Sequence, residues 1–254
     1  MEETQTTRSG NAITVGTVEV GKTFTAIAWA NLLAHRKIND VWVQTRPIIV
    51  LDHADNDKSF PDFNVIPMEY LQKDLNVLEN HQYRRVRIVV DDDDSESIDE
   101  FLKYLIHFQR DTVVLFDDIG NYFTGNLNDI QKKFIKTPKN NGNDYIHVFH
   151  TWREPAKKLL AVCGLAIVKQ TYDDLQKIEG LPFPAEMKIL QEEVDFENSQ
   201  RPDGERFATR IFDFKNYKVS VMDINNNFTT YKGYDYFRDK FKKTKRQNSS
   251  LTGK

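Results

Sequence analysis

The sequence predicts an α/β fold in which helices flank a mostly parallel sheet, followed by a C-terminal β-hairpin and a basic tail. In the first 190 residues, short apolar runs alternate with segments of helical periodicity, as in strands joined by crossover helices. After residue 206, apolar and polar residues alternate on both sides of Lys215-Asn216, as in a hairpin. Hydrophobic residues make up 39% of the 254 residues, enough to form a substantial core.

Each predicted strand is an apolar run that is too short for a helix. In chain order, the predicted strands of the parallel sheet are Asn11–Val15, Pro47–Leu51, Val86–Val90, Thr112–Phe116, Tyr145–Phe149 and Leu165–Val168. The predicted hairpin strands are Phe207–Phe214 and Tyr217–Met222.

Segments of helical periodicity separate these strands. The first predicted helix has an apolar face made of Phe24, Ile27, Ala28 and Leu32. A second helix spans Ile98–Ile106, and we interpret the four aspartates at 91–94 as its solvated start, with Ser95 and Ser97 as candidate caps. Short helices are expected at Leu127–Ile135 and Ala156–Leu160, with a loop at Thr137–Asn143 between the first of them and the next strand.

Charge and polarity divide the chain into three parts. Residues 1–194 are predicted to form one domain, and 195–237 a polar connector (195–206) and a hairpin packed on the same core. Residues 238–254 hold seven basic residues and one acidic residue, whereas the rest of the chain holds 28 basic and 37 acidic residues. Such a tail suits nucleic acid, and a merely solvated, unstructured end is the alternative.

Composition excludes several classes of protein. The single Cys163 excludes a disulfide scaffold and a cysteine-rich zinc site, and it fits a reducing compartment. No apolar run reaches the roughly 18 residues that span a bilayer. The first seven residues lack the basic-then-apolar order of a signal peptide. We therefore expect a soluble, intracellular protein without an integral membrane segment.

The strongest motif is Gly16-Thr17-Val18-Glu19-Val20-Gly21-Lys22-Thr23, which matches G-x-x-x-x-G-K-[ST]. It follows a predicted strand and opens a predicted helix, which is the context that a phosphate-binding loop requires. The glycines let the backbone wrap around a phosphate, and the free N–H groups at the helix start favour negative charge. Lys22 is expected to neutralise the β- and γ-phosphates of ATP, and the Thr23 hydroxyl to bind Mg²⁺. Together with Phe24, these residues form the predicted nucleotide-binding segment.

Three further polar residues follow the ends of predicted strands. Asp117 comes directly after an apolar strand, where a carboxylate can hold Mg²⁺, and Asp118 is placed to polarise the attacking water. His150 follows the next strand and is a candidate sensor of the γ-phosphate, with a purely structural histidine as the alternative.

The order of these elements resembles the FtsK–HerA-type P-loop ATPases, and most closely their viral and phage genome-packaging branch. Four stretches support the resemblance: Pro47–Asp52, Tyr83–Asp118, Phe149–Pro155 and Leu160–Leu175. The resemblance implies a RecA/ASCE-like P-loop NTPase fold, in which the strand that ends at the sensor lies between the phosphate-loop strand and the Mg²⁺ strand. It also implies a homo-oligomeric ring, a hexamer or a pentamer, in which a neighbouring chain supplies a cation to each ATP.

Several positions depart from the family pattern. The family usually has Glu where this chain has Asp118, and a small residue where it has Val20, while Glu19 adds an anionic side chain to the loop. For the cation supplied to the neighbour, the candidates are Lys139 and Arg153, both expected at the carboxyl side of the sheet. Lysine would be the weaker of the two, because it lacks the planar fork of arginine. These departures bear on the rate of hydrolysis more than on nucleotide binding.

The resemblance implies an ATP-driven DNA translocase that packages a viral or phage genome into a preformed capsid. Its implied partners are DNA of either strandedness, other copies of the chain, and a capsid or membrane-vertex protein, in the host cytoplasm or on the virion. Three alternatives stay open: a filamentous-phage DNA-export ATPase, a P-loop small-molecule kinase, and a nucleotide-gated binding protein with little turnover. A kinase of that class would place the Mg²⁺ strand directly beside the phosphate-loop strand.

Overall fold

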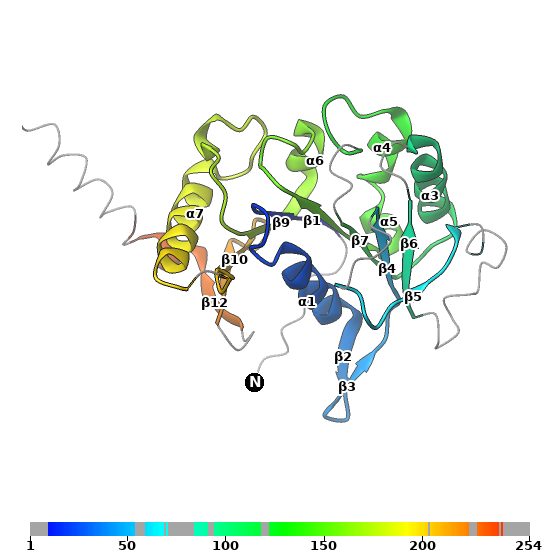
Figure 1. The fold of residues 1–254 in the computed structure, drawn as a ribbon, viewed down its shortest axis with the longest axis horizontal. Helices are drawn as coiled ribbons and strands as arrows, with labels where there is room; N and C mark the ends of the chain where they lie inside the picture. Colours follow the sequence, from blue (N-terminus) through cyan, green and yellow to red (C-terminus); the bar gives the residue numbers. More distant parts are fainter. Residues whose placement is uncertain are drawn as a thin grey trace, which may run out of the picture.

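The structure, a computed structural model, describes residues 10–53, 59–68, 70, 84–90, 94–117, 122–202, 204–223, 228–238 and 240. Its centre is a ten-stranded sheet in the order β12-β11-β10-β9-β1-β8-β7-β4-β6-β5 (Figure 1). The strands are β1 (Gly10–Val15), β4 (Ile48–Asp52), β5 (Asn64–Val65), β6 (Arg85–Val89), β7 (Val113–Phe116), β8 (Asp144–Phe149), β9 (Cys163–Val168), β10 (Thr209–Asp213), β11 (Lys218–Met222) and β12 (Phe228–Lys232). From β9 to β5 the neighbours pair in parallel, and from β9 to β12 they pair antiparallel. The predicted mostly parallel sheet and its C-terminal hairpin are both confirmed.

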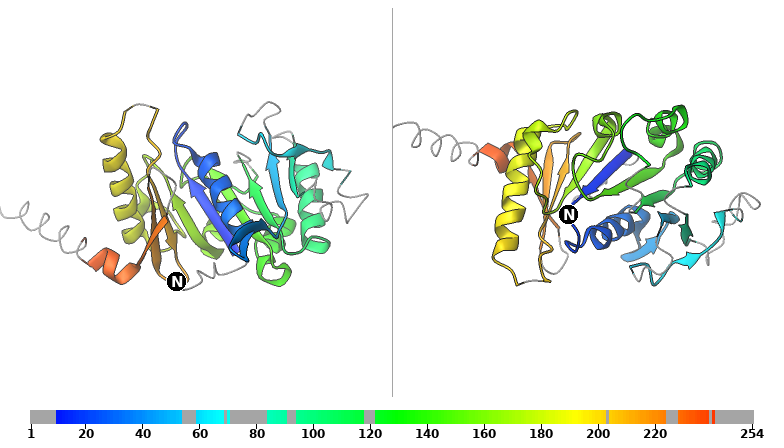
Figure 2. Two further views of the ribbon diagram at one scale, coloured as in Figure 1. Left: turned by 90° about the horizontal axis from the view of Figure 1, so that it is seen from below. Right: turned by 45° about the horizontal axis from the view of Figure 1, so that its top comes forward.

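Helices cover both faces of this sheet (Figure 2). One face packs against α1 (Lys22–Ala34), and the other against α3 (Ser95–His107), α4 (Asp129–Phe134), α6 (Lys157–Val162) and α7 (Pro184–Ser199). Within β7, Val113 and Leu115 belong to the core under α1, whereas Val114 and Phe116 belong to the core under the other four helices. This division follows from the alternation of side chains along a strand, and burial on both faces explains why the sequence shows continuous apolar runs.

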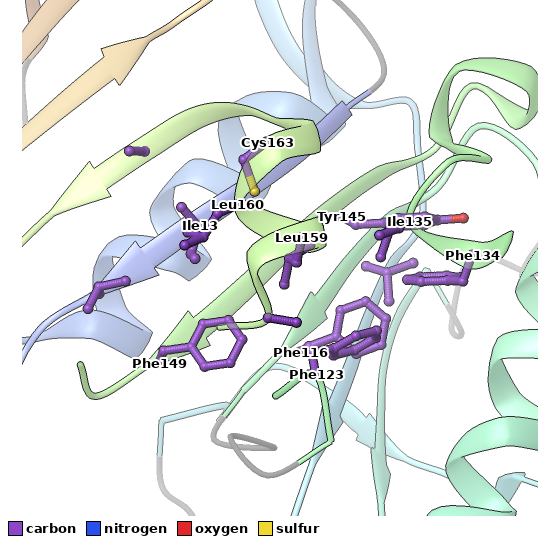
Figure 3. Close-up of a cluster of buried hydrophobic side chains, with 14 of the residues drawn as sticks. Ile13, Phe116, Phe123, Phe134, Ile135, Tyr145, Phe149, Leu159, Leu160 and Cys163 are labelled. Atoms are coloured by element: carbon purple, nitrogen blue, oxygen red, sulfur yellow. The ribbon is translucent and has the colours of Figure 1, made fainter. Parts of the chain in front are cut away.

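The larger core contains an aromatic cluster under α4 and α6 (Figure 3). The ring centroids of Phe116 and Phe134 lie 5.4 Å apart, and Phe134 stacks on Tyr145 at 4.1 Å. His147 stacks on Phe116 at 5.0 Å, and burial lowers the pKa of His147 to about 3. His147 is therefore neutral at physiological pH and acts as part of the core. Each fully buried ring stabilises the fold by about 1.5–3 kcal/mol relative to exposure.

The predicted apolar face of α1 is wrong in most of its residues, although Ile27 is partly buried against the core. Phe24 is 58% exposed, and the fully buried apolar residues are Ala26, Ala30 and Ala34. Alanines spaced four residues apart let the helix axis lie close to the sheet, where larger side chains would not fit. The apolar periodicity of the sequence favoured the bulky residues, which flank this contact instead.

The predicted connector at 195–206 is also wrong at its start. Helix α7 continues to Ser199, because Leu190, Val194 and Asn198 extend its buried face. The polar residues of its other face give this helix the composition of a loop. In the predicted loop 137–143, a short helix α5 (Pro138–Asn141) forms with Pro138 in its first turn.

Several elements were not predicted. A separate hairpin of β2 (His35–Ile38) and β3 (Val41–Gln44) follows α1, and Trp42 near its tip is 60% exposed. A short 3-10 helix, η3 (Leu175–Lys177), precedes α7, and β12 adds a third strand to the C-terminal hairpin. The cap of α3 is Asp94, which accepts a hydrogen bond from the backbone N–H of Ser97 at 2.9 Å, whereas the serines were the predicted caps. Asp91–Asp93 and residues 241–254 of the basic tail lie outside the described residues.

None of the helices described above combines the length and the apolar character that crossing a membrane requires.

Candidate nucleotide-binding site

The predicted phosphate-binding loop connects the end of β1 to the start of α1, and its two glycines have separate structural reasons. A Cβ atom at Gly16 would lie 2.5 Å from the Cβ of Lys169 and 2.8 Å from a methyl group of Val20. Any larger residue at this position would therefore displace the loop. Gly21 has φ 71° and precedes the first residue of α1, a left-handed conformation that favours glycine.

Two of the departures from the family pattern, Val20 and Glu19, lie in the loop, and they differ in burial. Val20 is 5% exposed and packs beneath the loop against Gly16. Glu19 is exposed, with φ 65°, a left-handed conformation that is uncommon outside glycine. The loop is anchored at Thr17, whose backbone N–H donates to the carbonyl of Gln170 at 2.8 Å. The buried side chain of Val20 and this backbone hydrogen bond of Thr17 together support the loop.

Lys22 connects the loop to the strand next to β1. Its Nζ donates to the Thr17 carbonyl at 3.2 Å and lies 2.7 Å from Nδ1 of His150. Because an ammonium group can only donate, Nδ1 of His150 is the acceptor and the ring proton is on Nε2. The contact follows from the parallel register of β1 and β8, which places Val15 opposite Phe149, the residue before His150. Two predicted residues, distant in sequence, thus lie together at this site.

Thr23 and Asp117 form the second pair at the same edge of the sheet. The Thr23 hydroxyl donates to the Asp117 carboxylate, at 2.9 and 3.1 Å from its two oxygens. Asp117 is 2% exposed and follows the last residue of β7. A hydroxyl and a carboxylate oxygen are hard ligands of the kind that Mg²⁺ prefers, so the residues present fit the predicted metal. Asp118, the predicted catalytic carboxylate, lies outside the described residues.

The strand that ends before His150, the predicted sensor, lies between the phosphate-loop strand and the strand that ends before Asp117. β8, which ends before His150, pairs with β1 on one side and with β7 on the other. Carboxyl ends of parallel strands meet at one edge, so Lys22, His150 and Asp117 gather there. The predicted insertion of the sensor strand is confirmed. The order does not fit a small-molecule kinase in which the phosphate-loop and Mg²⁺ strands are neighbours.

The two candidate cations for a neighbouring site lie at opposite edges of the sheet. Arg153 is on the carboxyl side, three residues past His150, and its exposed guanidinium lies 3.5 Å from Asp173. Lys139 is in α5, which leads into the start of β8. Its expected position at the carboxyl edge is wrong, because a parallel strand begins at the amino edge. At about 3.3 Å per residue, the six residues of β8 separate α5 from the site by about 20 Å.

Three residues near the site were not predicted. Glu154 accepts hydrogen bonds from the backbone N–H of His150 at 2.9 Å and fixes the turn after β8. Lys169, just after β9, is 1% exposed and donates to the carbonyl of Phe207 at 3.1 Å. Burial, with a smaller contribution from Arg201, lowers the pKa of Lys169 to about 7. The hydrogen bond to Phe207 and the packing of Lys169 against Gly16 tie the loop to the C-terminal extension of the sheet.

Phe207 itself packs on the loop. Its Cδ1 atom lies 3.0 Å from the position that a Cβ would take at Gly21. The only sequence signal for Lys169 was a cation directly after an apolar strand, and nothing in the sequence linked Phe207 to the loop. Both contacts depend on β10 pairing with β9, which local patterns do not encode.

Comparisons with solved structures agree with this fold. No protein-family model matches the sequence, and no curated protein matches it significantly. The genome packaging NTPase of Sulfolobus turreted icosahedral virus 2, in complex with ATPγS, is similar with a TM-score of 0.54 at 13% sequence identity. The similarity covers 88% of this chain and 97% of that one. The DNA-packaging ATPase of Sulfolobus turreted icosahedral virus has a TM-score of 0.51 at 13% identity, over 88% and 97% of the two chains. At this identity, the likeness establishes a P-loop NTPase fold.

Proposed function

We propose that this chain is an ATP-hydrolysing DNA translocase that packages a viral or phage genome into a preformed capsid. The observation that carries the proposal is the meeting of Lys22, His150, Thr23 and Asp117 at one sheet edge, with the sensor strand in the middle. This is the arrangement that the sequence resemblance implies. The two similar structures belong to a genome packaging NTPase and a DNA-packaging ATPase, and this likeness supports the DNA part of the proposal.

In the proposed reaction, Lys22, His150, Thr23 and Asp117 have roles that their positions support, and Asp118 has the role that the sequence predicts. Lys22 neutralises charge on the β- and γ-phosphates, and its contact with His150 places the sensor next to the reacting phosphate. Thr23 and Asp117 would hold Mg²⁺, which supplies further neutralisation of charge on the phosphates. Asp118 orients and polarises the attacking water.

We propose that a neighbouring chain in a ring supplies a further cation, which stabilises the charge that develops on the γ-phosphate during transfer. Arg153 is the better candidate, because it lies at the carboxyl side of the sheet and its side chain is 71% exposed. Lys139 lies at the amino edge of the sheet. It could reach a neighbour's ATP only if the ring brought the amino edge of one chain to the carboxyl edge of the next. The ring would work in the host cytoplasm and dock on a capsid or vertex protein.

Mixing two inactive variants tests the shared site. We expect Asp118→Asn to inactivate the pocket and Arg153→Ala to inactivate the cation that the chain presents to its neighbour. When the two variants exchange subunits, some interfaces pair an intact pocket with an intact Arg153, so ATP hydrolysis should recover. The control is each variant mixed with itself under the same conditions. A mixture as inactive as its parents, despite proven subunit exchange, would contradict the shared site.

A further inference from the structure

The four helices on one face of the sheet differ sharply in charge. Across that face, α6 and α4 lie between α7 and α3 (Figure 1). Helix α7 holds five acidic residues and one basic residue, and α3 holds three acidic residues and one basic residue. The two middle helices, α4 and α6, together hold four lysines and one aspartate. A basic zone thus lies between two acidic ones on a chain whose body is acidic overall.

We call this zone the lysine face, and it consists of the four helical lysines and of Lys136, which lies two residues past α4: Lys132, Lys133, Lys136, Lys157 and Lys158. Lys133, Lys136 and Lys158 are exposed, and within the described residues no carboxylate pairs with them. The two helices are close enough to act together, because Lys132 and, more weakly, Lys158 both lower the pKa of Asp129. Exposed, unpaired cations on neighbouring helices suit a partner with regularly spaced negative charge.

The lysine face is also connected to the nucleotide site. His150 contacts Lys22 through its ring and donates its backbone N–H to Glu154, and α6 begins three residues later. The turn between them is firmly held, since Trp152 is fully buried and the N–H of Ala156 donates to the carbonyl of Phe123 at 2.8 Å. A short, well-packed turn therefore joins His150 at the nucleotide site to the start of α6.

From this geometry we infer that the lysine face binds the phosphate backbone of DNA and that the His150–Glu154 turn links its position to the nucleotide site. The inference rests on the proposed function, and it names the surface that the moving DNA contacts. It assigns the main DNA contact to the folded domain and not to the C-terminal basic tail. Contacts to phosphates carry no base preference, as packaging a whole genome requires.

Three variants with the same charge change test this inference in the full-length chain. Lys133→Gln/Lys136→Gln/Lys158→Gln removes three charges from the lysine face. Lys103→Gln/Lys188→Gln/Lys218→Gln removes three exposed lysines elsewhere, and Lys242→Gln/Lys243→Gln/Lys245→Gln removes three from the tail. Binding of a labelled DNA duplex and of its single strand is measured by anisotropy over a salt series, alongside ATP hydrolysis without DNA.

We expect the lysine-face variant to bind duplex at least roughly tenfold more weakly at physiological salt, with a salt slope smaller by about 2–3, because each phosphate contact contributes about 0.9. Its hydrolysis without DNA should equal that of the unaltered chain, which shows that the fold and site are intact. The other two variants should lose less affinity for the duplex, and their salt slopes should change less. Equal losses in all three, or the largest loss in the tail variant, would overturn the inference and leave the proposed function standing. An unaltered chain that hydrolyses ATP and binds no DNA would overturn the proposed function as well.

Discussion

Replacing Lys22 with Ala will weaken ATP binding by about 2–3 kcal/mol, or roughly 30- to 150-fold in Kd, because a charge-assisted contact to the phosphates is lost. Lys22 is 7% exposed, and its ammonium group is held between the Thr17 carbonyl and His150. Turnover should fall further, because the same charge opposes the negative charge of the transition state. Isothermal titration with a non-hydrolysable ATP analogue measures the first effect, and a phosphate-release assay measures the second.

The matched control for Lys22 is Lys218→Ala, which removes an exposed lysine from β11, far along the sheet order from the loop. It should leave both ATP affinity and turnover unchanged. Thermal unfolding of both variants checks that each is folded. A folded Lys22→Ala chain with the affinity and turnover of the unaltered protein would refute the assignment of residues 16–24 as the phosphate-binding segment.

Replacing Asp118 with Asn will separate hydrolysis from binding. The substitution keeps the size of the side chain and removes its charge and basicity, so turnover should fall by about 10²- to 10⁴-fold, the usual contribution of a general base. ATP affinity should stay unchanged, because Asp118 is not expected to contact Mg²⁺ or the phosphates directly. Equilibrium binding and single-turnover hydrolysis, measured on the same preparation, provide the two readouts.

Asp117→Asn is the comparison variant for Asp118. Asp117 accepts the hydrogen bond of Thr23, and its loss should raise the Mg²⁺ concentration needed for half-maximal ATP binding. The two adjacent aspartates should thus give different defects, in metal dependence for Asp117 and in turnover for Asp118. If Asp118→Asn hydrolyses ATP at the unaltered rate, another carboxylate or the phosphate itself activates the water.

The sequence predicted the features that depend on local pattern and chain order. The phosphate loop could be recognised because its glycines and Lys22 have fixed spacing, and the strand before it is a buried apolar run. The order of strands followed from the resemblance, and it brought His150 beside Lys22 as the structure has it. The roles of these residues in hydrolysis stay predictions.

The features that the sequence did not reveal depend on how distant segments pack. The buried face of α1 consists of Ala26, Ala30 and Ala34, because the helix lies close to the sheet, and periodicity weighted by size selected other residues. Lys139 was placed at the wrong edge because the direction of β8 was overlooked: a segment that leads into a parallel strand lies at the amino edge, whether it is a loop or a helix. The contact of Phe207 with the loop required the pairing of β10 with β9, which lies beyond any local pattern.

ATP hydrolysis by the full-length chain, measured with Mg²⁺ in the absence and presence of DNA, tests the central claim most directly. The proposed function predicts Mg²⁺-dependent release of phosphate that DNA accelerates, and predicts that Lys22→Ala abolishes both the basal and the accelerated rate. Binding of ATP without measurable hydrolysis, or hydrolysis that DNA does not change, would contradict a DNA translocase.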